Sequence, residues 1–240
     1  MPRKSLFRSR STAAAGGPIF RLGVALVLWV SAMNVSAGAE SPTSMQTRWM
    51  AAAAADDTAT LQLLLAEGVD IELRDSRGRT ALLVATHHDA LEAARLLIEA
   101  GADVNAMDHI SDSPYLYAGA EGRLEILRLT LANGADLSSV NRYGGTALIP
   151  ATHHGHVETV RLLLTTETDI DHVNYLGWTA LLEAIILGDG SRTYIDIVRL
   201  LIEAGADVSL ADGDGVSPLA HALSRDYKEI AGLLKQAGAR

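Results

Sequence analysis

The fold is decided by residues 75–106, which read DSRGRTALLVATHHDALEAARLLIEAGADVNA. The pattern of this stretch recurs with a period of 33 residues, and such self-similarity predicts stacked copies of one small structural unit. The copies are 75–107, 108–140 and 141–173, then 174–211 with five extra residues, and a short last copy, 212–240. A degenerate first copy lies in about 42–74, so the repeats occupy nearly all of residues 40–240.

Residues that recur in each copy have distinct structural roles. Position 11 is alanine, small where neighbouring helices come close, and positions 22 and 23 are mostly a leucine pair on the buried face of a second helix. Position 27 is mostly glycine, because the chain needs a left-handed residue where that helix ends. Position 6 carries a hydroxyl suited to capping a helix N-terminus, in Thr80, Ser113, Thr146, Thr179 and Ser217. We therefore predict an all-α solenoid of helix–turn–helix–loop units with short hairpin loops and one continuous core.

Three residues depart from the repeat. Thr130 stands where the other copies have a core leucine, and Glu167 stands at the glycine position. A side chain at a left-handed position costs about 1 kcal/mol, so the sequence predicts that Glu167→Gly raises the melting temperature. Pro150 lies inside the first helix of copy 141–173, later than a first-turn proline, and we expect it to distort that helix.

Two stretches resemble ankyrin repeats: residues 75–106, with D-x-x-G-x-T and a final Gly-Ala-Asp-Val-Asn, and residues 141–164, NRYGGTALIPATHHGHVETVRLLL. The resemblance covers roughly residues 45–240. This chain mostly has T-A-L-L or T-A-L-I where the family has T-P-L-H, and copy 108–140 diverges most. The resemblance implies a curved solenoid whose hairpin tips and first helices line a concave surface that binds other proteins, without a cofactor.

Positions that vary while the frame repeats are candidates for partner recognition. Positions 2, 3 and 5 should lie at the hairpin tips, and positions 13 and 14 at the end of the first helix. The candidate partner-binding residues at these positions are Arg77, Arg79, His87, His88, Ile110, Arg142, Tyr143, His153, His154, Tyr175, Leu176, Trp178, Ile186 and Leu187.

The most apolar candidates are Tyr143, Tyr175, Leu176 and Trp178, with Ile186 and Leu187 nearby. Aromatic anchors at the centre of a surface are typical of binding hot spots. The alternative is that Tyr175 and Trp178 fold back onto the next repeat and belong to the core. The insertion around residues 187–192 falls between two helices, where it is either a binding loop or a neutral elongation.

Residues 1–39 predict an export signal. They hold five basic residues and no acidic one, then the uncharged run LGVALVLWVSAM at 22–33 and a small-residue stretch that ends at Ala39. This order is typical of a cleaved signal peptide, with cleavage after Ala39 preferred and after Ala37 nearly as good. The run of 12 residues is too short for a stable membrane anchor, which needs about 20. We expect a periplasmic protein; the alternatives are secretion, an organelle transit peptide and an uncleaved anchor.

Composition excludes several kinds of site. The chain has no cysteine, which excludes a disulfide framework, a thiolate metal site and a cysteine nucleophile. Five of the 20 basic residues lie in 1–39, so residues 40–240 carry 15 basic and 29 acidic side chains, a net charge of −14. Such a surface repels phosphate backbones, so we expect no nucleic-acid partner.

The sequence carries no phosphate loop, dinucleotide fingerprint or Gly-x-Ser-x-Gly, and its Asp-Gly runs lack the closing glutamate of a calcium loop. The histidine pairs at 87–88 and 153–154 lie two repeats apart, too far to share one ion. We predict a monomeric, non-catalytic interaction module without cofactor or metal, acting as a scaffold, inhibitor or chaperone-like binder. The alternatives are a metal- or stress-handling accessory protein that uses its surface histidines, and a secreted effector that binds a host protein.

Overall fold

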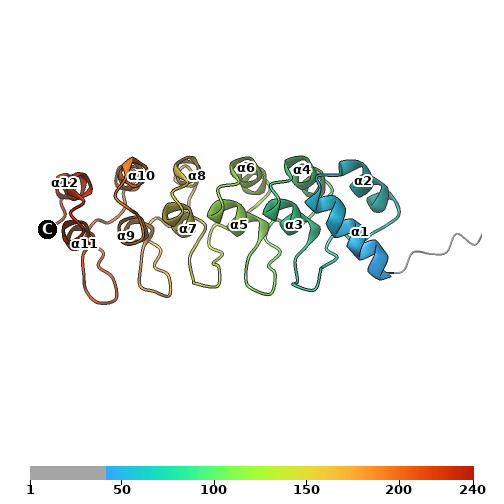
Figure 1. Cartoon of the computed structure of the whole chain (residues 1–240), viewed down its shortest axis with the longest axis horizontal. Coiled ribbons are helices and arrows are strands. Elements are labelled where there is room, and N and C mark those ends of the chain that lie inside the picture. Colours follow the sequence, from blue (N-terminus) through green and yellow to red (C-terminus); the bar gives the residue numbers. More distant parts are fainter. Residues whose placement is uncertain (1–41) are drawn as a thin grey trace, which may run out of the picture. The chain divides into compact units, whose positions relative to one another are not determined.

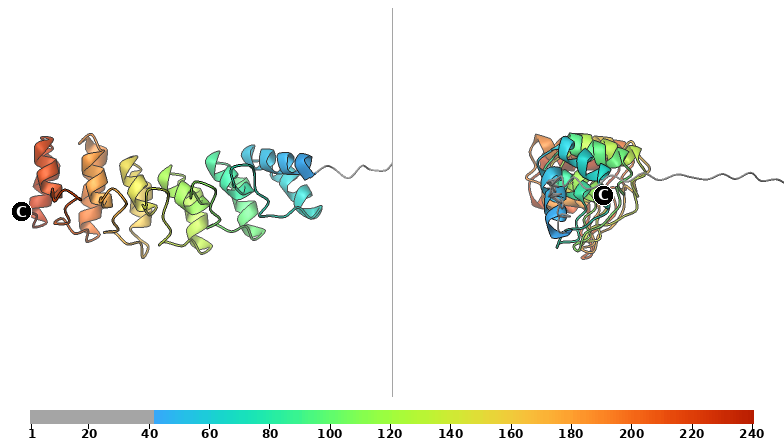
Figure 2. Two further views of the ribbon diagram at one scale, coloured as in Figure 1. Left: turned by 90° about the horizontal axis from the view of Figure 1, so that it is seen from below. Right: turned by 90° about the vertical axis from the view of Figure 1, so that its right-hand side faces the viewer.

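In the computed structural model the described residues are 42–240, which belong to the compact unit Glu40–Arg240. The predicted signal segment and its cleavage site lie outside the described residues. Figure 1 shows the unit as two parallel rows of helices with a hairpin loop hanging below each step, and Figure 2 shows the same rows from below and end-on. The all-α solenoid predicted from the repeat is confirmed.

The inner row is formed by the first helix of each repeat: α1 (Pro42–Ala54), α3 (Ala81–His87), α5 (Pro114–Ala120), α7 (Leu148–His153), α9 (Ala180–Ile186) and α11 (Pro218–Ser224). The outer row is formed by the second helices: α2 (Thr58–Ala66), α4 (Leu91–Glu99), α6 (Leu124–Ala132), α8 (Val157–Leu163), α10 (Arg192–Glu203) and α12 (Lys228–Gln236). Each helix contacts its partner and the helices of the same row in the adjacent repeats, so no repeat buries its apolar face alone.

The core follows the repeated positions. The alanines at position 11 are fully buried in α3, α5, α7, α9 and α11, where a larger side chain would separate the inner helices. The leucines at position 23 are equally buried, in Leu97, Leu163, Leu201 and Leu234. Thr130, which replaces the leucine in α6, is also fully buried, and its hydroxyl donates to the carbonyl oxygen of Leu127 at 2.9 Å.

The predicted N-caps are confirmed in four repeats, where Thr80, Ser113, Thr179 and Ser217 each accept a hydrogen bond from the backbone N–H three residues later. The prediction is wrong for Thr146, whose buried hydroxyl has no hydrogen-bond partner. The cause is Pro150, which has no N–H to donate to the Thr146 carbonyl. The N–H of Ile149 donates to that carbonyl instead, at 3.3 Å, and α7 begins at Leu148.

The outer helices end at a left-handed glycine in five repeats, where Gly68, Gly101, Gly134, Gly205 and Gly238 take φ between 84° and 98°. The expectation that Glu167 takes this conformation is wrong, since its φ is not positive. Helix α8 ends at Leu163, which is position 23 of its repeat, whereas α4 ends at Glu99, which is position 25 of its repeat. The hydroxyl of Thr166 donates to the Leu163 carbonyl at 2.6 Å and accepts the N–H of Thr168 at 3.3 Å, which closes the helix without a left-handed residue.

The hairpin loops are fixed by the first residue of each repeat. The side-chain oxygen of Asn141 accepts the N–H groups of Tyr143 and Gly145, and that of Asn174 accepts those of Leu176 and Trp178. Asp75, Asp108 and Asp212 do the same in their own loops. These bonds hold each loop in one shape and set the direction of the side chains at its tip.

Candidate partner-binding groove

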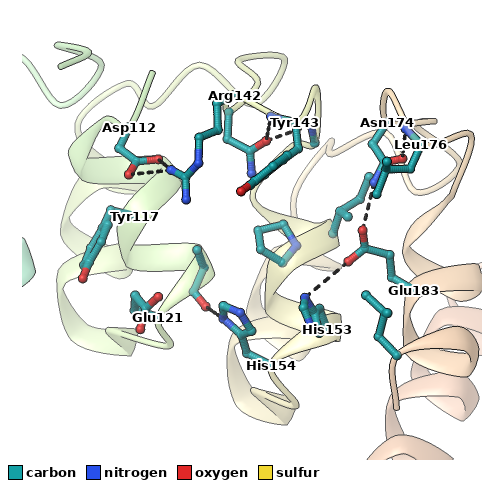
Figure 3. Close-up of a pocket in the computed structure, with 16 residues that line it drawn as sticks. Asp112, Tyr117, Glu121, Arg142, Tyr143, His153, His154, Asn174, Leu176 and Glu183 are labelled. Atoms are coloured by element: carbon teal, nitrogen blue, oxygen red, sulfur yellow. Dashed lines mark hydrogen bonds and ion pairs between the residues drawn. The ribbon is translucent and has the colours of Figure 1, made fainter. Parts of the chain in front are cut away.

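A groove opens in the middle of the unit, where α5, α7 and α9 meet the hairpin loops that precede α7 and α9 (Figure 3). It encloses about 380 Å³. We call it the central groove. Its walls are Asp112, Tyr117, Ala120, Glu121, Asn141, Arg142, Tyr143, Gly145, Ile149, Pro150, His153, His154, Asn174, Leu176, Glu183 and Leu187. The inner helices supply one wall and the hairpin loops the other, which is the pair of elements that the sequence predicted for partner contact.

Six of the predicted partner-binding residues line the central groove: Arg142, Tyr143, His153, His154, Leu176 and Leu187. The other eight lie outside it: Arg77, Arg79, His87, His88, Ile110, Tyr175, Trp178 and Ile186.

Several residues outside the groove have other roles. Arg79 forms a 2.7 Å ion pair with Asp75 in its own hairpin loop. The ring of His87 stacks on Tyr117 with 3.8 Å between centroids, and burial lowers the pKa of His87 below its ordinary value. The carbonyl of Ile186, at the end of α9, accepts a hydrogen bond from Arg225 at 3.2 Å.

The aromatic residues of the fifth repeat divide between two environments. Tyr175 is 78% exposed, yet its ring lies against Gly144 of the preceding hairpin loop, where a side chain on residue 144 would collide with it. Its N–H donates to the Tyr143 carbonyl at 2.9 Å, which ties the two loop tips together. Trp178 is half-buried. Leu176, which lies between Tyr175 and Trp178 in the sequence, faces the central groove with 56% of its surface exposed.

Glu183 is the most unusual polar residue of the groove. It lies on α9 with only 8% of its side chain exposed, and the Asn174 side chain donates to Oε1 at 2.9 Å. Burial removes water from the carboxylate and raises the pKa of Glu183 to about 7, although the hydrogen bond from Asn174 opposes the shift. At neutral pH the groove therefore holds a carboxyl group poised between its charged and neutral forms.

The histidines of α7 extend from Glu183 along the groove. The Nδ1 atom of His153 lies 3.8 Å from Oε2 of Glu183, beyond hydrogen-bond distance, and burial lowers the pKa of His153. The neutral imidazole therefore does not balance the charge of Glu183 at neutral pH. His154 is held from the opposite side, with its Nδ1 atom 2.7 Å from the Ala120 carbonyl oxygen (Figure 3).

The rings of His153, His154 and His156 follow one another at centroid distances of 4.8 and 5.9 Å. Within residues 42–240, no group of three or more histidine, aspartate or glutamate side chains is arranged to hold a metal ion.

Arg142 closes the other end of the groove. Its guanidinium lies 3.3 Å from Asp112 and 4.8 Å from the centre of the Tyr143 ring. Burial raises the pKa of Asp112, and the nearby charge of Arg142 opposes that shift. Because Asp112 already pairs with Arg142, this arginine is not free to neutralise the remaining carboxylates, Glu121 and Glu183.

The other ten lining residues were not among the predicted contacts, and Tyr117 and Glu183 are two of them. Both stand at position 10 of their repeats, three and four residues before positions 13 and 14. Residues at these spacings share one face of a helix, so the candidates at positions 13 and 14 could have led to them. The repeat pattern does not predict the hydrogen bond between the buried side chains of Asn174 and Glu183, which lie nine residues apart in the sequence.

No helix among residues 42–240 combines the length and the apolar character needed to cross a bilayer.

A family model for ankyrin repeats matches residues 26–108 and 115–212. The chain is 49% identical over 57 residues to the ankyrin repeat protein YahD of Escherichia coli (strain K12), a match that covers 24% of this chain and 28% of that relative. The chain therefore spans well under half the length of this curated relative.

Several solved ankyrin-repeat structures cover most of the chain. An ankyrin repeat domain from Acinetobacter baumannii AYE is 59% identical with a TM-score of 0.78, over 80% of this chain and 98% of that one. The ankyrin repeat domain of Bcl-3, a member of the IkappaB protein family, is 27% identical with a TM-score of 0.72, over 80% of this chain and 86% of that one. The repeat, the two helix rows and these matches show that the chain belongs to the ankyrin-repeat family.

Proposed function

We propose that the chain is a non-catalytic binding protein that holds a partner protein in its central groove and acts outside the cytoplasm. Ankyrin repeats are protein–protein interaction modules, and the family is generally non-catalytic. The observation that carries the proposal is the groove itself, which is formed by inner helices and hairpin loops with six candidate contact residues on its walls.

The chemistry of the groove supports a protein partner. Its rim exposes Tyr143, Leu176 and Leu187 by 55%, 56% and 41%, so several large apolar side chains are exposed together on one groove. Beside these side chains lie polar groups held in position by hydrogen bonds or ion pairs, Arg142, His154 and the buried Glu183. An apolar rim around a few oriented polar groups is the usual composition of a recognition site.

The location outside the cytoplasm rests on the sequence of residues 1–39, whose basic start, apolar run and Ala37-Gly38-Ala39 stretch are typical of a cleaved signal peptide. The lack of cysteine in all 240 residues means that folding needs no disulfide in an oxidising compartment. We place the protein in the periplasm on this basis.

The proposal is tested by affinity capture from the extracytoplasmic fraction of the native cells. The bait is the protein itself, compared with Leu176→Ala and with the matched control Leu223→Ala, which removes an equally exposed leucine from α11, outside the groove. We expect one protein to be retained by the parent and by Leu223→Ala, and lost or strongly reduced with Leu176→Ala. Equal retention by all three baits would refute the groove as the binding site.

A further inference from the structure

We propose that the central groove recognises a basic side chain, so that the partner protein inserts a lysine or arginine that pairs with Glu183. This inference rests on the proposed function, because it names the chemistry of the partner that docks in the same groove. It depends on three features of the groove: an incompletely paired buried carboxylate, an excess of negative charge and an apolar rim.

The carboxylate of Glu183 lines the groove with more than nine-tenths of its side chain buried. Oε1 accepts one hydrogen bond, from Asn174 at 2.9 Å. Oε2 makes no hydrogen bond with any residue of 42–240, and its ionic contact with His153 spans 3.8 Å. Oε2 is not fully buried and opens into the groove, where an ammonium or guanidinium group can donate a charge-assisted hydrogen bond to it.

The charges around Glu183 favour a cation over an anion. The carboxylates of Asp112, Glu121 and Glu183 line the groove, against one permanently charged base, Arg142, which already pairs with Asp112. Residues 40–240 have a net charge of −14, so the whole unit attracts a basic segment and repels an acidic one.

The rim fits the remainder of a basic side chain. Leu176 and Leu187 lie on the wall near Glu183, and both are partly exposed. Lysine and arginine carry long aliphatic stems that pack on apolar surface while the charged end reaches a polar group. A basic residue flanked by apolar neighbours in an extended segment therefore matches the groove better than a uniformly basic tail does.

The experiment uses a phage-displayed library of random 12-residue peptides, selected on the immobilised protein at pH 8, where Glu183 is ionised. The best peptides are then made synthetically, each with a second version in which its lysine or arginine is replaced by uncharged norleucine. Their dissociation constants are measured for the parent, for Leu176→Ala, for Glu183→Gln and for Glu158→Gln. The last is the matched control, an exposed glutamate on α8 outside the groove. Thermal melting establishes that each variant is folded.

We expect the selected peptides to share one basic position. Norleucine at that position should weaken binding at least tenfold for the parent and for Glu158→Gln, and less than twofold for Glu183→Gln. If binding weakens with Leu176→Ala but the peptides show no basic preference, the cation proposal fails while the proposed function stands. The same holds if the norleucine effect is equal in the parent, Glu183→Gln and Glu158→Gln. Peptides that bind independently of Leu176, or no binders at all, would overturn both.

Discussion

Among the residues of the central groove, Glu183 has a carboxyl group whose charge depends on pH near neutrality. Glu183 is buried on α9 and hydrogen-bonded once, and His153 and His154 lie near it at the end of α7. Burial raises the pKa of Glu183 from its ordinary 4.5 to about 7. The folded state therefore holds this proton more tightly than the unfolded state does, and that contribution to stability is lost as the pH rises.

The first prediction concerns Glu183→Gln. The neutral carboxyl stabilises the fold fully below about pH 4.5, and this contribution disappears as the pH rises through about 7. Glutamine stays neutral and keeps the acceptor for Asn174. The unfolding free energy of the variant should therefore match the parent near pH 5 and exceed it by about 2–3 kcal/mol at pH 8. Denaturant melts at both pH values measure this, and an equal gain from the exposed Glu158→Gln would contradict the assignment to Glu183.

Glu167 and Ser111 form a second, paired prediction. Ser111 occupies the glycine position of its hairpin loop with φ of 63°, whereas the φ of Glu167 is not positive. Ser111→Gly should therefore stabilise the protein by about 1 kcal/mol, and Glu167→Gly should leave it unchanged or lower its stability through added backbone freedom. Differential scanning calorimetry of both variants is the measurement. A higher melting temperature for Glu167→Gly would show that α8 ends as the other outer helices do.

At the scale of the element, α7 shows what the repeat pattern predicts and where it stops. The period placed the helix and its buried alanine, Ala151, correctly. The period also predicted that Thr146 caps this helix, and that prediction is wrong. Because Pro150 has no N–H, the N–H of Ile149 donates to the Thr146 carbonyl and the Thr146 hydroxyl has no partner. Likewise α8 ends early because the Thr166 hydroxyl caps its last carbonyl, that of Leu163. The missing cap of α7 and the early end of α8 both arise because neighbouring groups compete for hydrogen bonds within one turn. A pattern of residue types at fixed positions does not predict the outcome of that competition.

We predict that Pro150→Ala restores the N-terminal cap and the first helical hydrogen bond of α7. The new N–H can donate to the Thr146 carbonyl, as the equivalent N–H does in α3 and α9, and it frees the Ile149 N–H for the Thr146 hydroxyl. Gaining a cap and a helical hydrogen bond should stabilise the protein by about 1 kcal/mol, or roughly 2–4 °C in melting temperature. A thermal melt checks this, and the double variant Pro150→Ala/Thr146→Val should lose the gain. A lower melting temperature for Pro150→Ala would mean that the proline, not the cap, stabilises this helix.

At the scale of the whole molecule, the repeat determines the framework and leaves the contents of the groove open. The period predicts the two helix rows, the core and the surface that faces a partner, because these follow from positions that recur in every copy. The groove instead depends on residues that do not recur, such as Glu183 at position 10, which meets the loop residue Asn174 only when the loop folds over the helix. The predicted contacts at positions 13 and 14 reached the groove in two repeats, while Arg77 and Ile110 lie on other hairpin loops.

Site-specific photocrosslinking in the native cells is the most direct test of the central groove as the binding site. A benzophenone amino acid replaces Leu176 on the rim of the central groove in one variant and Leu223 on α11 in another; these side chains are 56% and 55% exposed. We expect one discrete crosslinked partner with the Leu176 variant and none with the Leu223 variant. A partner captured equally from both positions, or only from position 223, would contradict the central groove as the site where this ankyrin-repeat protein binds.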